Sequence, residues 1–178
     1  MSCNRSKSSA RRSSVESLEA RRLLSVVFGA DFESPLGDGW QITGDPVVLW
    51  HVTDVMYQSG SHSLYYGRDV ERNYDIGTSR GSVVTPTINL IGADSPRLIF
   101  QYMLEVETIP LEDVRVQISP DNGVTWDTLA SVWPEGSEAQ LQYNVGWKSC
   151  IISLDGYVGE MVKLRFYFDS VDDVANQY

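Results

Sequence analysis

The sequence predicts an all-β protein in which two antiparallel sheets pack face to face. From residue 31 onward, short apolar segments recur between clusters of Gly, Pro, Asp and Asn, which is typical of strands separated by turns. Several segments alternate apolar and polar residues, as strands with one buried face do. No stretch after residue 22 keeps helical periodicity over about ten residues or more. Because each such strand buries only one face, a second sheet must cover the first.

Charge divides the chain into a basic leader, residues 1–30, and an acidic body, residues 31–178. The leader holds six Lys and Arg residues against two Glu, whereas the body holds 8 basic and 22 acidic residues. Residues 1–14 have almost no apolar content, so we expect them to be disordered. Residues 17–30 follow the order of an export signal, with basic residues before a short apolar stretch. A short amphipathic helix docked on the body is the alternative.

The acidity of the body limits its partners. A net charge of −14 over residues 31–178 repels phosphate backbones, so we expect no nucleic acid partner. The same surface is open to divalent cations, although a merely solvated acidic surface is the simpler interpretation. Cys3 and Cys150 lack the spacing of a disulfide or zinc site, and Cys150 fits a small buried side chain. No apolar run approaches the ~20 residues of a membrane span.

The expected strands follow one another at the spacing of a sandwich. The first begins at residue 31, and a Gly-Asp-Gly turn leads to the next at residues 40–42. The later strands are expected at residues 47–52, 62–66, 82–85, 97–105, 113–118, 125–132, 147–154 and 161–168. In the last segment, apolar residues occupy every second position, so one face should be buried. No propeller or solenoid repeat is present, and the expected architecture is a jelly roll.

A polar turn at residues 119–126 joins two of these strands and predicts a hairpin. Asp and Asn side chains bond nearby backbone groups, and Gly123 adopts a positive φ without steric cost. The stretch reads S-x-D-x-G-x-T-W, which resembles the Asp-box motif. That resemblance implies that Ser119 and Asp121 brace the turn while Trp126 packs beneath it. The Asp-box resemblance therefore predicts a hairpin and indicates no catalytic or binding chemistry.

Further motifs follow in order through the body: D-F-E at 31–33, G-W at 39–40, W-H at 50–51, S-G-S-H-S-L-Y-Y-G at 59–67, T-P-T-I-N-L at 85–90, the Asp-box, L-D-G-Y-V-G at 154–159 and R-F-Y-F-D-S-V-D at 165–172. This order resembles the jelly-roll domains related to MAM domains, which accompany secreted bacterial peptidases of the immune-inhibitor-A type and large surface adhesins. The resemblance implies a non-catalytic sandwich module. The leader string L-E-x-R-x-L-L-S is similar to the N-terminal motif of exported and surface proteins of planctomycete bacteria, which favours export.

The resemblance also implies a missing strand. Similar domains continue with an acidic or polar residue, Gly-Trp-Tyr, an apolar residue and Asp-Asp, whereas this chain reaches Tyr178 before such a segment. We therefore expect a sheet without its last strand and unpaired backbone groups near residues 31–34. A donor strand from a partner, or from the remainder of a longer chain, could fill that gap.

Carboxylates near both ends of the body form the candidate metal site. Asp31 and Glu33 flank the first expected strand, and Asp169, Asp172 and Asp173 follow the last. The first and last strands of a jelly roll can lie side by side, which would bring these groups together. Calcium prefers several such oxygen ligands, so the hypothesis is a Ca²⁺ site that stabilises the fold. Surface charge without a bound ion is the alternative.

Catalysis is not indicated by the sequence. His51 and His62 lie in no nucleophile motif, and no hydrolase or metalloprotease pattern is present. Glu105 and Glu107 fit a solvated strand end better than a glycosidase pair. We expect a protein without enzyme activity.

The aromatic residues suggest a second class of site. Trp133 lies in a loop with Pro, Glu and Gly, and we select it with Tyr143 as candidate ligand contacts. The expected function is a secreted or cell-surface module that mediates adhesion or protein interaction, with or without calcium. The alternative is a carbohydrate-binding module of a secreted enzyme, which would show exposed aromatic rings on one sheet face or loop rim.

Overall fold

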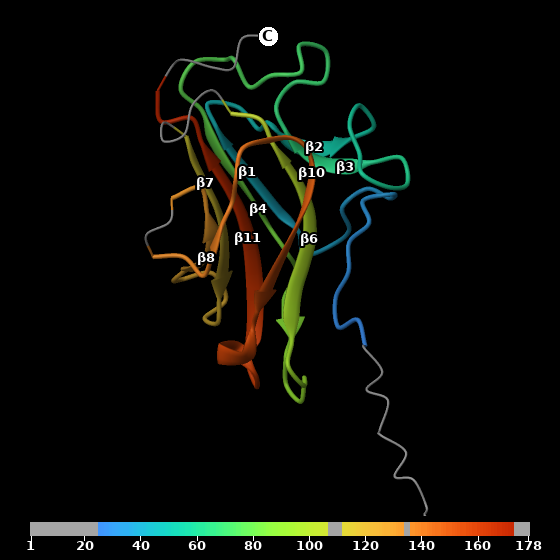
Figure 1. Ribbon diagram of the computed structural model, residues 1–178, viewed down its shortest axis with the longest axis vertical. Coiled ribbons are helices and arrows are strands. Elements are labelled where there is room, and N and C mark those ends of the chain that lie inside the picture. The colour runs from blue at the N-terminus through green and yellow to red at the C-terminus, as the bar shows by residue number, and fades with distance from the viewer. Residues whose placement is uncertain (1–24, 107–111, 134–135, 173–178) are drawn as a thin grey trace, which may run out of the picture.

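The computed structural model describes residues 25–106, 112–133 and 136–172, and these residues form a β-sandwich (Figure 1). Its elements are β1 (Gln41–Asp45), β2 (Trp50–Thr53), β3 (Ser63–Tyr66), β4 (Arg80–Val84), β5 (Ile88–Asn89), β6 (Arg97–Leu104), β7 (Asp113–Ser119), β8 (Asp127–Ser131), β9 (Ala139–Gln140), β10 (Asn144–Ser153), the 3-10 turn η1 (Asp155–Tyr157) and β11 (Met161–Asp169). The prediction of an all-β sandwich is confirmed. The strands pair in antiparallel fashion except β8 and β9, which are parallel.

The larger sheet is organised around β11. Its order is β1-β4-β11-β7-β8-β9. Phe166 of β11 faces Val83 of β4 across one edge and Val116 of β7 across the other. Where β4 ends, β5 takes its place along β11, with Asn89 opposite Met161. The central strand is therefore paired along both edges.

The second layer is smaller and consists of two separate strand pairs. β6 pairs with β10, and β2 pairs with β3. In Figure 1, β10 crosses in front of the larger sheet, β6 runs to the right of β11, and the β2–β3 hairpin lies beside the upper ends of β6 and β10. The smaller layer therefore covers only part of the larger sheet.

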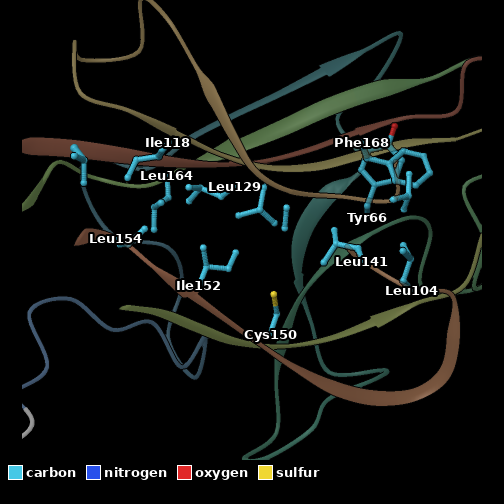
Figure 2. Packing of buried hydrophobic residues seen from close by; sticks show 14 of the residues in the cluster. Tyr66, Leu104, Ile118, Leu129, Leu141, Cys150, Ile152, Leu154, Leu164 and Phe168 are labelled. Atoms are coloured by element: carbon cyan, nitrogen blue, oxygen red, sulfur yellow. The ribbon is translucent and has the colours of Figure 1, made fainter. Parts of the chain in front are cut away.

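The core lies between the two layers. Figure 2 shows Ile118, Leu129 and Leu164 of the larger sheet pointing toward Ile152 and Cys150 of β10. All five side chains are buried, and Cys150 is a free thiol as expected. The strands meet here because their alternate apolar residues face a common interior.

The alternation expected along β11 is present. Val162, Leu164 and Phe168 are buried, whereas Phe166 is only half-buried. The intervening polar residues point to the outer face, as the period of two requires. The partial exposure of Phe166 indicates that the layer above it is incomplete.

At the start of the body, one expected strand is absent and another begins later than predicted. Residues 31–34 form no strand, because Phe32 has a φ of 61°, which lies outside the extended region. The expected strand at residues 47–52 begins only at Trp50. After β1 the chain folds back so tightly that a Cβ on Gly44 would collide with the backbone of Val47.

In the predicted hairpin at residues 119–126, Ser119 and Asp121 form the hydrogen bonds expected to hold the turn. The buried hydroxyl of Ser119 donates to Asp121 Oδ1 at 2.7 Å and accepts the Gly123 N–H at 2.7 Å. The Thr125 N–H donates to Asp121 at 2.9 Å, and the Trp126 indole N–H donates to the Gly123 carbonyl at 3.1 Å. Hydrogen bonds from Thr125, followed by Ser119, hold the pKa of Asp121 well below its ordinary value.

Replacing the buried hydroxyl should destabilise the fold through this turn. Ser119→Ala removes the acceptor of the Gly123 N–H, so we expect the free energy of unfolding to fall by about 1–3 kcal/mol. Urea denaturation measures the change. Val124→Ala, at an exposed position in the same turn, is the control and should stay within about 0.5 kcal/mol of the unsubstituted chain. Equal stability of the two variants would contradict a bracing role for Ser119.

Candidate functional site

A cleft of about 700 Å³ opens between the smaller layer and the larger sheet. This volume is within the usual range of ligand sites, roughly 300–1,000 Å³. Aromatic side chains from distant parts of the chain form much of its lining: Phe28, Phe32, Trp40, Trp50, Tyr65, Tyr66, Phe100, Tyr102, Trp147 and Phe166. The cleft is therefore a candidate binding site.

The cleft exists because β6 has a free edge. Within the described residues, β6 pairs with β10 on one side and with no strand on the other. Its inward side chains Leu98, Phe100 and Tyr102 line the cleft and are only half-buried. Leu104, at the end of β6, is buried against the core. The smaller layer thus leaves apolar surface uncovered along most of β6.

The β2–β3 hairpin supplies a second wall. The ring of Trp50 lies 5.3 Å from that of Tyr66, which stacks on Phe168 of β11 at 4.3 Å. The indole nitrogen of Trp50 is buried and has no hydrogen-bond partner among the described residues. A buried N–H without an acceptor is costly, so the hairpin beside the cleft contains an unsatisfied donor.

The N-terminal strap, residues 28–33, also borders the cleft. Phe28 and Phe32 place their rings 6.0 and 6.3 Å from the ring of Trp40. Glu33 anchors the strap to the turn before β3. Its Oε1 accepts the Ser61 N–H at 2.8 Å, and its Oε2 accepts the Ser61 hydroxyl at 2.6 Å. The strap is therefore fixed by one carboxylate.

The turn at Gly60, Ser61 and His62 has the shape of an anion-binding nest. Glu33 Oε1 accepts both the Ser61 N–H and the His62 N–H, the latter at 3.1 Å. Gly60 has a φ of 69°, and a Cβ at this position would collide with Glu33 Oε1. The hydroxyl and N–H of Ser61, followed by His62, lower the pKa of Glu33 from 4.5 to about 2. Sequence reasoning missed this contact, although the small residues Ser-Gly-Ser signalled the turn.

His62 takes part in the same contact without forming a catalytic relay. Its Nδ1 lies 2.9 Å from Ser61 Oγ and 3.2 Å from Glu33 Oε2. In a hydrolytic relay, the nucleophile and the carboxylate bond to opposite nitrogens of the imidazole. Here both groups lie at Nδ1, so this trio cannot pass a proton from Ser61 to Glu33 through the ring.

His51 connects β2 to the turn after β3. Its Nδ1 lies 2.8 Å from the Leu49 carbonyl, and its Nε2 lies 2.9 Å from Asp69 Oδ1. Thr53 donates to the same Asp69 oxygen at 2.7 Å. Partial burial would raise the pKa of Asp69, but hydrogen bonds from His51 and Thr53 outweigh this effect and lower it. The ring is thereby held in place by both of its nitrogens.

The structure does not gather the candidate calcium ligands that it describes. Asp31 accepts the backbone N–H of Glu33, whose own carboxylate is held by the nest. Asp169 accepts the Tyr167 hydroxyl and the Val171 N–H at the other end of the chain. Within residues 25–106, 112–133 and 136–172, no group of three or more His, Cys, Asp or Glu side chains is placed to hold a metal ion.

The other two candidate calcium ligands, Asp172 and Asp173, follow β11 in the sequence. Asp172 is described and lies in the bend after β11, where its carbonyl accepts the Ser170 hydroxyl. Asp173 lies outside the described residues. Calcium binding therefore stays a prediction from the sequence, which a rise in melting temperature with millimolar calcium would support and no shift would oppose.

The candidate ligand contacts Trp133 and Tyr143 are both partly exposed, at 38% and 45%. Trp133 follows β8, and Tyr143 precedes β10. No ring contact joins them within the described part of the chain, so they do not form a common platform there. Trp133 instead borders a separate hollow beside Arg115.

Comparison with known proteins adds no relative: no protein-family model, curated protein or solved structure matches the chain. The likeness to MAM-related jelly rolls stays a prediction from the motifs. In the part of the chain that the structure describes, no helix has the length and apolar content needed to cross a bilayer.

The anchoring of Glu33 should appear as an unusual titration. Because the folded-state pKa of about 2 lies below the ordinary 4.5, the anchor contributes stability above pH 4.5 and loses it as the pH falls toward 2. The amide proton shifts of Ser61 and His62, followed by NMR, should titrate near pH 2. The same signals should not titrate in Glu33→Gln. A midpoint near 4.5 would show that the carboxylate is free in solution.

Proposed function

We propose that this chain is a non-catalytic, secreted or cell-surface interaction module whose cleft accepts an extended strand of a partner protein. The observation that carries this proposal is the free edge of β6 beside an apolar cleft of about 700 Å³. An exposed strand edge is a template for another strand, and β-augmentation is a common mode of peptide recognition.

The side-chain pattern of β6 supports a strand as the ligand. The cleft follows residues 98–105, and along this edge Leu98, Phe100 and Tyr102 are half-buried, whereas Ile99 and Gln101 between them are exposed. A strand paired with β6 would place its own alternate side chains on the same side, between the two layers. Backbone hydrogen bonds to β6 would provide affinity, and the shape of the cleft would select apolar side chains.

The indole of Trp50 supports the same ligand class. Its buried N–H lacks an acceptor among the described residues. Every residue of an extended peptide brings a carbonyl oxygen, so a peptide that displaces the side chains covering this nitrogen would supply the missing acceptor.

The cellular location in this proposal comes from the sequence. The basic leader with its short apolar stretch and L-E-x-R-x-L-L-S string favours export, and the order of motifs resembles MAM-related modules of secreted and surface proteins. The absence of catalysis in this proposal also comes from the sequence, and the trio of Ser61, His62 and Glu33 differs from a hydrolytic relay because both partners of His62 lie at one ring nitrogen.

A strand-forming peptide should stabilise the chain. The probe is Gly-Trp-Tyr-Val-Asp-Asp-Val, which follows the last-strand pattern of the resembling domains. Because only the folded chain binds it, a concentration of 100 Kd should add about 2.7 kcal/mol to the free energy of unfolding. Thermal melting with and without peptide gives the shift. A peptide with Pro at the central Val lacks a backbone donor and should bind more weakly.

Two variants locate the binding site. Phe100→Ala removes a side chain from the cleft wall and should reduce the peptide-dependent shift. Ile151→Ala trims an exposed side chain of β10 that does not line the cleft, so the shift should be retained. If the unsubstituted chain melts cooperatively at high temperature and ignores the peptide, the cleft is not a strand acceptor.

A further inference from the structure

A polar hollow of about 290 Å³ lies on the outer face of the larger sheet, away from the core between the layers. Strands β7 and β8 form its floor, and Trp133 and Gly136 border it. Its lining residues are Arg115, Thr128, Ser131, Trp133 and Gly136. It combines one indole with a guanidinium and two hydroxyl groups.

Strand register places the polar groups on one face. Arg115 lies opposite Ser131, while the adjacent pair Val116 and Ala130 is buried in the core. Since side chains alternate between the faces of a sheet, Arg115 and Ser131 both point outward. Thr128 lies on this face as well, where its hydroxyl accepts from Gln117 at 3.4 Å.

The rim holds Trp133 in a defined position. Its backbone N–H donates to Ser131 Oγ at 3.1 Å, and its carbonyl accepts the Ser137 hydroxyl at 3.2 Å. These bonds fix the backbone on both sides of the residue, yet 38% of Trp133 stays exposed. A large aromatic side chain thus lies at the surface next to hydrogen-bonding groups. This arrangement suits a ligand ring that stacks on the indole.

Arg115 supplies donors to the same hollow. Its Nε donates to Asp113 Oδ1 at 2.7 Å, and its side chain is 43% exposed. The terminal guanidinium nitrogens make no hydrogen bond to the described residues and can donate to a ligand. Asp113 compensates much of the positive charge, so the hollow offers directed donors rather than a strong anion site.

The outer face continues beyond the hollow with more aromatic surface. Tyr167 lies opposite Arg115 across the β7–β11 pair. The guanidinium of Arg165 stacks over the ring of Trp126 at 4.3 Å and lies 5.7 Å from the ring of Tyr167. Rings and planar polar groups therefore extend along one sheet face.

We propose that the hollow beside Trp133 and Arg115 binds a neutral saccharide. Sugar rings present C–H groups that pack on an indole and hydroxyls that pair with guanidinium, hydroxyl and carboxylate groups. The net charge of −14 over residues 31–178 repels acidic sugars, which favours the neutral class. Arg115 borders both this hollow and the strand-accepting cleft, whereas Trp133 lines the hollow alone, so the effect of Trp133→Ala separates the two proposals.

The test measures saccharide binding to the full chain by NMR. The probes are neutral trisaccharides of glucose, mannose and galactose, compared with trigalacturonate and sialyllactose. We expect at least one neutral probe to shift the indole N–H signal of Trp133. Trp133→Ala should weaken its binding at least tenfold, and Trp133→Phe should retain an intermediate affinity. Tyr143→Ala is the matched control, since Tyr143 is similarly exposed but does not line the hollow.

Several results would overturn the proposal. They are the failure of every neutral probe to bind at millimolar concentration, binding of the acidic probes alone, and equal binding by Trp133→Ala and the unsubstituted chain. Thermal melting of each variant shows whether it is folded. Equal losses in Trp133→Ala and Tyr143→Ala would also count against the site, because only the first residue borders the hollow.

Discussion

The pairing of β11 along both edges is the constraint on which the sandwich depends. Phe166 faces Val83 on one side and Val116 on the other, so the register of three strands is set together. A shift of one residue would turn Val162 and Leu164 outward and bring Lys163 inward, which the buried interior would not tolerate. The same register places Arg115 and Tyr167 on the outer face. Core and outer surface are thus two consequences of one alignment.

The unequal size of the layers explains the cleft. The larger sheet presents a continuous inner face, whereas β6–β10 and β2–β3 are separate pairs that leave part of it uncovered. Phe100 and Tyr102 remain half-buried for this reason, although they face inward. Uncovered apolar surface beside a free strand edge favours association with another strand. The strap reduces this exposure from one side through the contact between Glu33 and the turn before β3.

That contact shows how a few local features create a long-range anchor. Gly60 allows a left-handed backbone and leaves room for a carboxylate, and Ser61 and His62 then present successive N–H groups. Glu33 reaches this turn across 28 positions of sequence. The turn itself can be inferred from its residue types. The identity of the carboxylate that fills it cannot, because the body contains many acidic residues with the same chemistry.

The sequence by itself determined the strands with clear alternation and the bracing of the hairpin by Ser119 and Asp121, since these features depend on neighbours a few residues apart. The sequence misplaced the strands at the start of the body. There, the backbone conformation of Phe32 and the tight turn at Gly44 prevent strand formation in segments whose apolar residues predict it. Only the tertiary structure decided which strand edge is unpaired among the described residues and that Glu33 anchors a strap. It also placed Trp133 next to Arg115 and not next to Tyr143. Such contacts depend on how distant strands are ordered in a sheet, and periodicity along the chain carries no information about that order.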